Sequence, residues 1–173
     1  MNTKNKRKIE VFLFGIIGIV LVMCVWHKYD TDKIIVQKYD IECNVNNRIR
    51  IVQLTDLHNR KFRDYNIDLI NKVAEQSPDL IFMTGDMFGQ NDNLEVICSC
   101  IKLLSEIAPV YYSYGNHEIY WDNGTEIELR AALTEAGASV LNCEYVDVEV
   151  KGEKQRIGGY YGYYRASHMR TAD

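Results

Sequence analysis

The stretch DLIFMTGD, at residues 79–86, is a short apolar run that ends in Gly-Asp. A run of this length and composition is typical of a β-strand that is buried on both faces of a parallel sheet. Similar runs, each ending in polar residues, lie before and after it at residues 48–56 and 109–118. We therefore expect these three segments to be neighbouring strands of one sheet.

Segments with the apolar spacing of helices separate these strands. They cover residues 64–79, 93–107 and 124–137, and the last has Thr125 as its expected N-cap and Gly137 after its end. Further strands and a final hairpin are expected at residues 34–43, 138–142, 144–150 and from about Gln155. This alternation predicts the α/β class, with parallel strands and helices on both faces of the sheet.

The first 33 residues differ from the remainder in charge and hydropathy. They carry six Lys or Arg against three Asp or Glu, whereas the remainder has a net charge of −7. Residues 11–26 contain no charged side chain and follow a basic cluster at residues 4–8. We therefore expect a transmembrane helix, a signal anchor, over residues 9–27. A cleaved signal peptide is the alternative, although no small-residue cleavage site follows.

The same charge pattern predicts a location. An excess of Lys and Arg before the anchor favours a cytoplasmic basic tail at residues 1–8 and an extracytoplasmic remainder, in a single-pass protein of the cell membrane. The overall net charge of −4 argues against a general nucleic-acid binder. The five cysteines are scattered and odd in number, which does not resemble a disulfide framework. We expect Cys98 and Cys100 to be small buried hydrophobic residues and not a metal-binding pair, and cysteines outside the cytoplasm to be either buried or paired.

Polar side chains follow three of the expected strands at the point where each strand ends. They are Asp56 and His58, then Asp86, then Asn116 and His117. Asp56, Asp86 and Asn116 are each 30 residues apart, which is the length of one β-α-β step. Because the carboxyl ends of parallel strands share one edge of the sheet, we expect these side chains to converge.

Carboxylates, imidazoles and amide oxygens together suit Mn²⁺, Fe or Zn²⁺ better than they suit thiolate-preferring ions. A carboxylate on the middle strand, such as Asp86, can touch two cations, and such a pair can clamp a phosphate for hydrolysis. His117 can protonate a leaving alkoxide or hold transition-state charge. Each motif alone is compatible with ordinary turn chemistry, so the interpretation depends on all three occurring together.

The motifs D-x-H, G-D and G-N-H-[DE], in this order, resemble those of the calcineurin-like metallophosphoesterases. An N-terminal anchor ahead of LTDLH, TGD and YGNHE looks like the bacterial membrane-associated branch, whose members are described as phosphodiesterases or phosphohydrolases. The resemblance implies a β-sandwich flanked by helices. By this reading, residues 28–47 form a spacer and first strand, and residues 48–173 form a partial domain of that family.

The resemblance also implies roles for the site residues. Asp56 and His58 would bind a first divalent metal ion, and Asp86 would bridge two. Asn116 would bind the second ion, and His117 would be the catalytic imidazole near the leaving group.

Position 89 departs from the family pattern. The family motif is usually G-D-x-x-D, and its second Asp supports the catalytic histidine. Here Gly89 stands in that place, and Asp92 and Glu118 are the candidates to replace the missing carboxylate.

The family's remaining imidazole ligands come from a later histidine and a G-H-x-H motif, which does not occur before Asp173. His168 is the only histidine after His117, and its surroundings do not match that motif. We therefore expect a truncated product, a fragment or a degenerate copy in which at most one metal ion is well held.

The resemblance thus implies metal-dependent hydrolysis of a phosphodiester or phosphomonoester by a membrane-anchored enzyme. A non-catalytic metal-binding remnant of the same fold at the membrane stays open as the alternative. The expected partners are a phosphoester substrate and the membrane through residues 9–27. A position near the membrane favours a lipid-linked or cell-envelope substrate, and a soluble nucleotide stays open as the alternative. No nucleic-acid binding is expected.

Overall fold

The computed structural model describes residues 3–31, 33–43, 45–62, 66–161 and 170–171. The chain divides into two units, Met1–Lys38 and Tyr39–Asp173. The first unit contains the helix α1 (Thr3–Thr31), in which residues 12–26 are exposed. Residues 9–27, where the sequence predicted a transmembrane anchor, lie within this helix. In the part of the chain that the structure describes, no helix is both long and apolar enough to cross a membrane.

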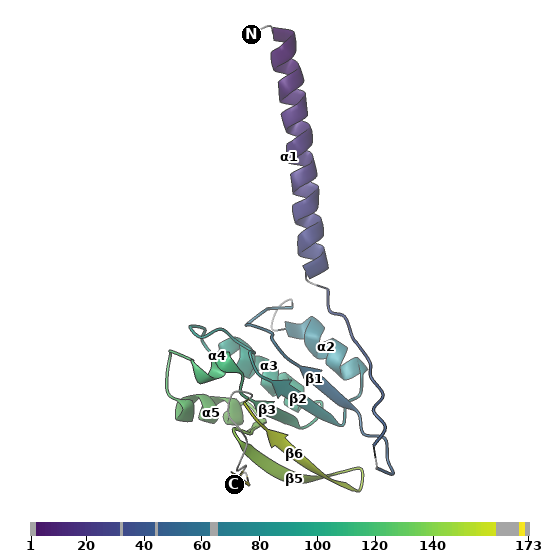
Figure 1. The fold of residues 1–173 in the computed structure, drawn as a ribbon, viewed down its shortest axis with the longest axis vertical. Helices are drawn as coiled ribbons and strands as arrows, with labels where there is room; N and C mark the ends of the chain where they lie inside the picture. Colours follow the sequence, from purple (N-terminus) through teal and green to yellow (C-terminus); the bar gives the residue numbers. More distant parts are fainter. Residues whose placement is uncertain (1–2, 32, 44, 63–65, 162–169, 172–173) are drawn as a thin grey trace. The chain divides into compact units, whose positions relative to one another are not determined.

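The second unit is built on a parallel sheet of four strands in the order β1-β2-β3-β4 (Figure 1). The strands are β1 (Ile51–Leu54), β2 (Leu80–Thr84), β3 (Val110–Ser113) and β4 (Ala138–Val140). The helices are α2 (Ile67–Glu75), α3 (Glu95–Ser105), α4 (Asn116–Ile119) and α5 (Glu126–Glu135). The sequence predicted these strands and three of these helices, whereas the short α4 was expected to be part of a strand.

The helices begin and end where local chemistry changes. Thr125 caps α5 as predicted, because its hydroxyl accepts a hydrogen bond from the Glu128 amide (3.3 Å) while Glu128 Oε2 accepts one from the Thr125 amide (2.8 Å). Helix α2 is shorter than predicted, because Asn66 before it has a left-handed φ of 61° and Ser77 after it a φ of 48°. Neither conformation continues an α-helix.

Strand β2 has both of its faces buried. Ile81 and Met83 are fully buried, while Leu80 belongs to a separate apolar cluster on the opposite side of the sheet. Alternation along a strand places Ile81 and Met83 on one face and Leu80 on the other. The sequence interpretation of residues 79–86 as a doubly buried strand is confirmed at Leu80, Ile81 and Met83, whereas Phe82 is half-buried and Thr84 is exposed.

A second sheet covers the Leu80 face of the first. It has the order β6-β5-β7 and consists of β5 (Glu144–Val150), β6 (Glu153–Gly159) and β7 (Arg170–Thr171). Val150 and Ile157 of its hairpin pack against Leu80 and Leu141. The prediction of helices on both faces is therefore wrong for this face, because the apolar residues of the predicted hairpin cover it. Two stacked sheets with helices outside agree with the metallophosphoesterase-type fold that the resemblance implied.

Residues 34–43, predicted as a strand, form none in the structure. Ile35, Tyr39 and Ile41 are 71%, 79% and 83% exposed, and no described strand pairs with this segment. An alternating pattern alone does not make a strand, because the backbone groups of a strand need those of a neighbour.

The cysteines differ in their surroundings. All five are free, and Cys100 is buried in α3 as expected. Burial raises the pKa of the Cys100 thiol to about 12, although a hydrogen bond with Asn66 opposes this rise. Cys98 is half-buried, whereas Cys24 and Cys43 are exposed and free, so the expectation that each cysteine is either buried or paired is wrong for these two.

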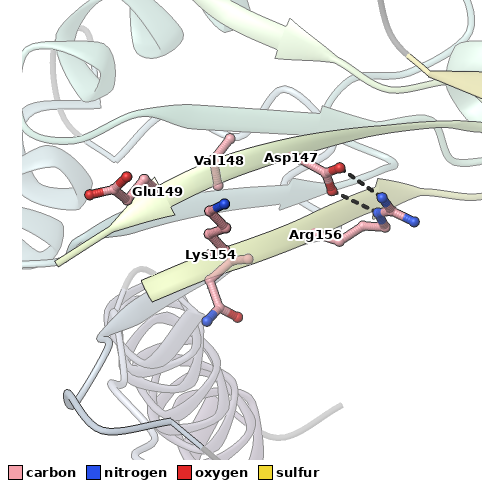
Figure 2. Close-up of a pocket in the computed structure, with 6 residues that line it drawn as sticks. Asp147, Val148, Glu149, Lys154 and Arg156 are labelled. Atoms are coloured by element: carbon pink, nitrogen blue, oxygen red, sulfur yellow. Dashed lines mark hydrogen bonds and ion pairs between the residues drawn. The ribbon is translucent and has the colours of Figure 1, made fainter. Parts of the chain in front are cut away.

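A recess of about 660 Å³ lies against the hairpin (Figure 2). Across it, Arg156 donates two hydrogen bonds of 2.7 Å to Asp147, and its guanidinium lies 4.2 Å from the ring centre of Tyr145. The recess shares no residue with the strand ends that the sequence predicted as a site.

Candidate metal centre

The loops after β1 and β2 run side by side, because backbone hydrogen bonds continue beyond the strands. The donor–acceptor pairs are Asp56 N to Gly85 O (3.1 Å), His58 N to Asp86 O (3.1 Å) and Asn59 N to Met87 O (2.8 Å). The two predicted ligands after β1 are thereby held next to the one after β2.

These loops contain unusual backbone conformations. Asp56, His58, Asn59 and Asp86 have φ values of 55°, 46°, 58° and 55°. They are half of the eight non-glycine residues with positive φ in the described part of the chain. Each such residue costs on the order of 1–3 kcal/mol, and such residues gather at functional sites. The surrounding hydrogen bonds hold the four residues in these conformations.

The loops after β2 and β3 touch through their glycines. A Cβ added at Gly85, whose φ is +87°, would lie 2.4 Å from the Gly115 nitrogen. A Cβ added at Gly115 would lie 2.4 Å from Asp86 Oδ1. The same Asp86 oxygen accepts a hydrogen bond from the His117 amide (3.0 Å). Only glycines permit this approach, which brings Asp86 and His117 together.

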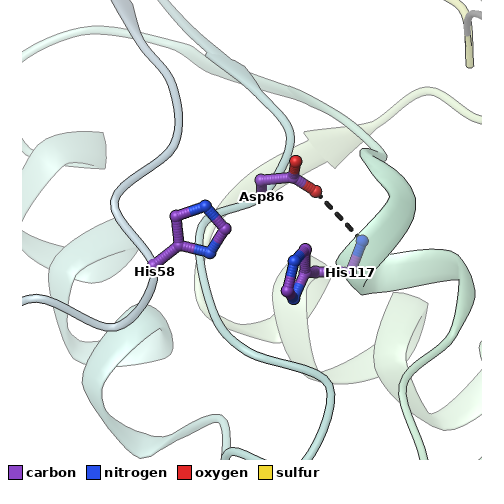
Figure 3. Close-up of side chains that lie close together, drawn as sticks. All are labelled: His58, Asp86 and His117. Carbon is purple, nitrogen blue, oxygen red and sulfur yellow. Dashed lines mark hydrogen bonds between the residues drawn. The ribbon is translucent and has the colours of Figure 1, made fainter.

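Three of the predicted site residues meet at the strand ends. His58, Asp86 and His117 each offer one ligand atom, and these atoms all lie within 4.8 Å of one another. Figure 3 shows the two imidazoles and the carboxylate around a common space. The rings of His58 and His117 are 4.7 Å apart between centroids and nearly perpendicular. The loops after three consecutive strands thus contribute to one cluster.

The other two predicted ligands are Asp56, which lies close to His58, and Asn116, which directly precedes His117 in the sequence. Asp56 Oδ1 is 3.9 Å from His58 Nε2, and its Oδ2 accepts a hydrogen bond of 2.6 Å from the Thr55 hydroxyl. Asn116 is half-buried and begins α4, directly before His117. His168 lies outside the described residues.

The cluster fits a divalent cation. Two imidazoles and a carboxylate are ligands that Mn²⁺, Fe and Zn²⁺ accept. His117 Nδ1 is buried and has no hydrogen-bond partner among the described residues. A buried nitrogen without a partner costs about 1–3 kcal/mol. The described residues leave this nitrogen unsatisfied, as expected for a histidine whose partner is an ion or a substrate group.

Asp92 and Glu118 were the candidates to replace the carboxylate that is missing at position 89. Neither is hydrogen-bonded to His117 Nδ1, which has no partner among the described residues. Asp92 Oδ2 accepts a hydrogen bond from the Gly89 amide (2.8 Å) and occupies the space beside Gly89. Glu118 instead accepts hydrogen bonds from backbone amides of the two site loops. Its carboxylate accepts a hydrogen bond from the Gly115 amide three residues earlier, but Gly115 has no side chain to complete a capping box, so no local sequence signal announced this role.

The family model of the calcineurin-like phosphoesterases matches residues 49–170. The chain is also similar to three curated proteins. It is 26% identical over 119 residues to the uncharacterized metallophosphoesterase YkoQ of Bacillus subtilis, covering 67% of this chain and 44% of that protein. It is 35% identical over 125 residues to the uncharacterized metallophosphoesterase Cj0846 of Campylobacter jejuni, covering 68% and 33%. It is 31% identical over 96 residues to the phosphodiesterase YaeI of Escherichia coli, covering 53% and 36%. The matched part thus spans less than half the length of each relative.

Proposed function

Because the chain belongs to the calcineurin-like phosphoesterase family, we propose that it takes part in metal-dependent hydrolysis of a phosphoester. The observation that carries this proposal is the meeting of His58, Asp86 and His117 at the ends of three parallel strands. The similarity to the phosphodiesterase YaeI favours a diester as the substrate.

The proposed metal ligands are those that the resemblance implied. Asp56 and His58 would hold one ion, Asn116 a second, and Asp86 would touch both. A divalent ion held there would polarise the phosphoryl group of the substrate as a Lewis acid. Mn²⁺, Fe and Zn²⁺ are the proposed ions, since the ligands are imidazole, carboxylate and amide groups.

We propose that the side chain of His117 acts as a general acid. Its backbone amide is fixed to Asp86 Oδ1, so the imidazole has a set position beside the carboxylate. From that position it would donate a proton to the leaving oxygen as the bond between phosphorus and that oxygen breaks. Such a proton transfer matters most for an alkoxide leaving group, which is a strong base.

Hydrolysis of bis(p-nitrophenyl) phosphate by the 173-residue chain tests the proposal. We expect hydrolysis in the presence of Mn²⁺, loss of hydrolysis after chelation, and recovery when Mn²⁺ is returned, because the ions supply the charge that the phosphate needs. Hydrolysis that is insensitive to chelation would contradict the proposal. Tight binding of Mn²⁺ without any hydrolysis would support the alternative, a metal-binding domain without catalysis.

Association with the cell membrane through residues 9–27, with the C-terminal domain outside the cytoplasm, stays a prediction from the sequence. Its support is the charge-free run at residues 11–26 behind the basic cluster at residues 4–8. The chain should then sediment with the membrane fraction of expressing cells and stay there after a high-salt wash. Recovery in the supernatant before the wash would show that the prediction is wrong. A lipid-linked or cell-envelope substrate depends on this result.

A further inference from the structure

Glu118 is a buried carboxylate, only 3% exposed, between the two loops that bring Asp86 and His117 together. Its Oε1 accepts hydrogen bonds from the Met87 amide (2.9 Å) and the Tyr112 hydroxyl (2.6 Å). Its Oε2 accepts hydrogen bonds from the amides of Asp86 (2.8 Å) and Gly115 (2.8 Å). One side chain therefore binds the backbone of both loops.

These bonds explain how a charge is tolerated at this depth. Burial of a carboxylate is costly unless hydrogen-bond donors replace the water that it loses, and here each oxygen has two donors. Burial, and then the nearby Glu118 charge, raises the pKa of Tyr112 well above its usual value, so the hydroxyl keeps its proton and continues to donate.

Both the backbone and the side chain of Asp86 are held by neighbouring groups. Its amide is bound to Glu118, while its own Oδ1 accepts the hydrogen bond from His117 N and lies against Gly115. Any displacement of the Glu118 carboxylate therefore shifts the backbone that presents the Asp86 side chain to the cluster.

We propose that Glu118 is a positioning residue for the metal centre. Its buried carboxylate binds the backbone on both sides of the centre and so fixes the relative positions of Asp86 and His117. This inference rests on the proposed function. Groups that orient metal ligands through hydrogen bonds affect metal affinity although they never touch the ion. The competing explanation is that Glu118 only caps α4, in which case its loss lowers stability and leaves metal affinity unchanged.

Glu118→Gln separates these explanations. Glutamine has nearly the same shape, but in either orientation its NH₂ group faces at least one backbone amide that needs an acceptor. We expect the affinity for Mn²⁺, titrated by electron paramagnetic resonance on the 173-residue chain, to fall by about 10–100-fold. Tyr112→Phe removes one donor and keeps all three amide bonds, so we expect a smaller loss.

Leu133→Ala is the matched control for stability. Leu133 is fully buried in α5 and is not part of the site, so its truncation leaves a cavity in the core and lowers the urea midpoint of unfolding. If fold stability alone determined metal binding, this variant and Glu118→Gln would lose affinity together. We expect Leu133→Ala to keep the parent affinity at temperatures where circular dichroism shows it folded.

Folded Glu118→Gln with the parent affinity for Mn²⁺ would overturn the inference while leaving the proposed function intact. If Glu118→Gln does not fold, the Tyr112→Phe variant provides the test. An unchanged affinity of that variant for Mn²⁺ would overturn the inference. A parent chain that binds no Mn²⁺ would overturn the proposed function and this inference with it.

Discussion

Replacing Asp86 with asparagine should lower the rate of phosphodiester hydrolysis by about 10³-fold or more, since it removes several kcal/mol of metal-dependent stabilisation. Asparagine keeps an oxygen that can accept the hydrogen bond from His117 N, so the loops should stay in place. It lacks the negative charge with which Asp86 would bind a divalent cation. The rate and the Mn²⁺ affinity should therefore fall together.

Asp147→Asn is the matched control for Asp86→Asn. Asp147 is also an aspartate with hydrogen-bonded oxygens, but its side chain is 60% exposed on the hairpin and its partner is Arg156. An exposed ion pair contributes little to stability, so this variant should keep the parent rate and metal affinity. If Asp86→Asn hydrolyses the diester as fast as Asp147→Asn does, Asp86 has no part in the reaction.

Replacing His117 with glutamine should slow the cleavage of a diester with an alkoxide leaving group by about 10²–10⁴-fold, the usual contribution of a general acid. The effect should be much smaller for a p-nitrophenyl diester, because p-nitrophenolate leaves readily without a proton. Rates for both diesters, measured on the same preparation of His117→Gln, give the comparison.

The ratio of the two losses distinguishes the roles open to His117. Its place in the cluster also allows it to bind an ion directly. In that case both diesters would slow equally and the Mn²⁺ affinity would fall. An equal slowing of this kind would contradict the role of proton donor that the resemblance implied.

The sequence predicted that His58, Asp86 and His117 meet, and the reason is geometric. Asp56, Asp86 and Asn116 are each one β-α-β step apart, and parallel strands end at one edge, so their spacing alone places them near one another. A glycine precedes both Asp86 and Asn116 in the sequence, and the structure shows close loop contacts at both glycines.

The sequence did not predict what depends on contacts between distant segments. The left-handed φ of His58 and the burial of Glu118 follow from hydrogen bonds to the loop after β2, which no local pattern reveals. For the same reason residues 34–43 were misjudged as a strand, because their alternation does not show whether a partner strand exists. The second sheet replaced an expected helical layer because the predicted hairpin folds back over Leu80.

The central claim is that side chains at the ends of β1, β2 and β3 together hold a divalent metal ion. A manganese anomalous difference map, from crystals of the chain grown with Mn²⁺, tests it most directly. The account predicts a peak within bonding distance of His58 and Asp86, beside the His117 imidazole. A map with manganese bound elsewhere and no peak at His58 and Asp86 would contradict it.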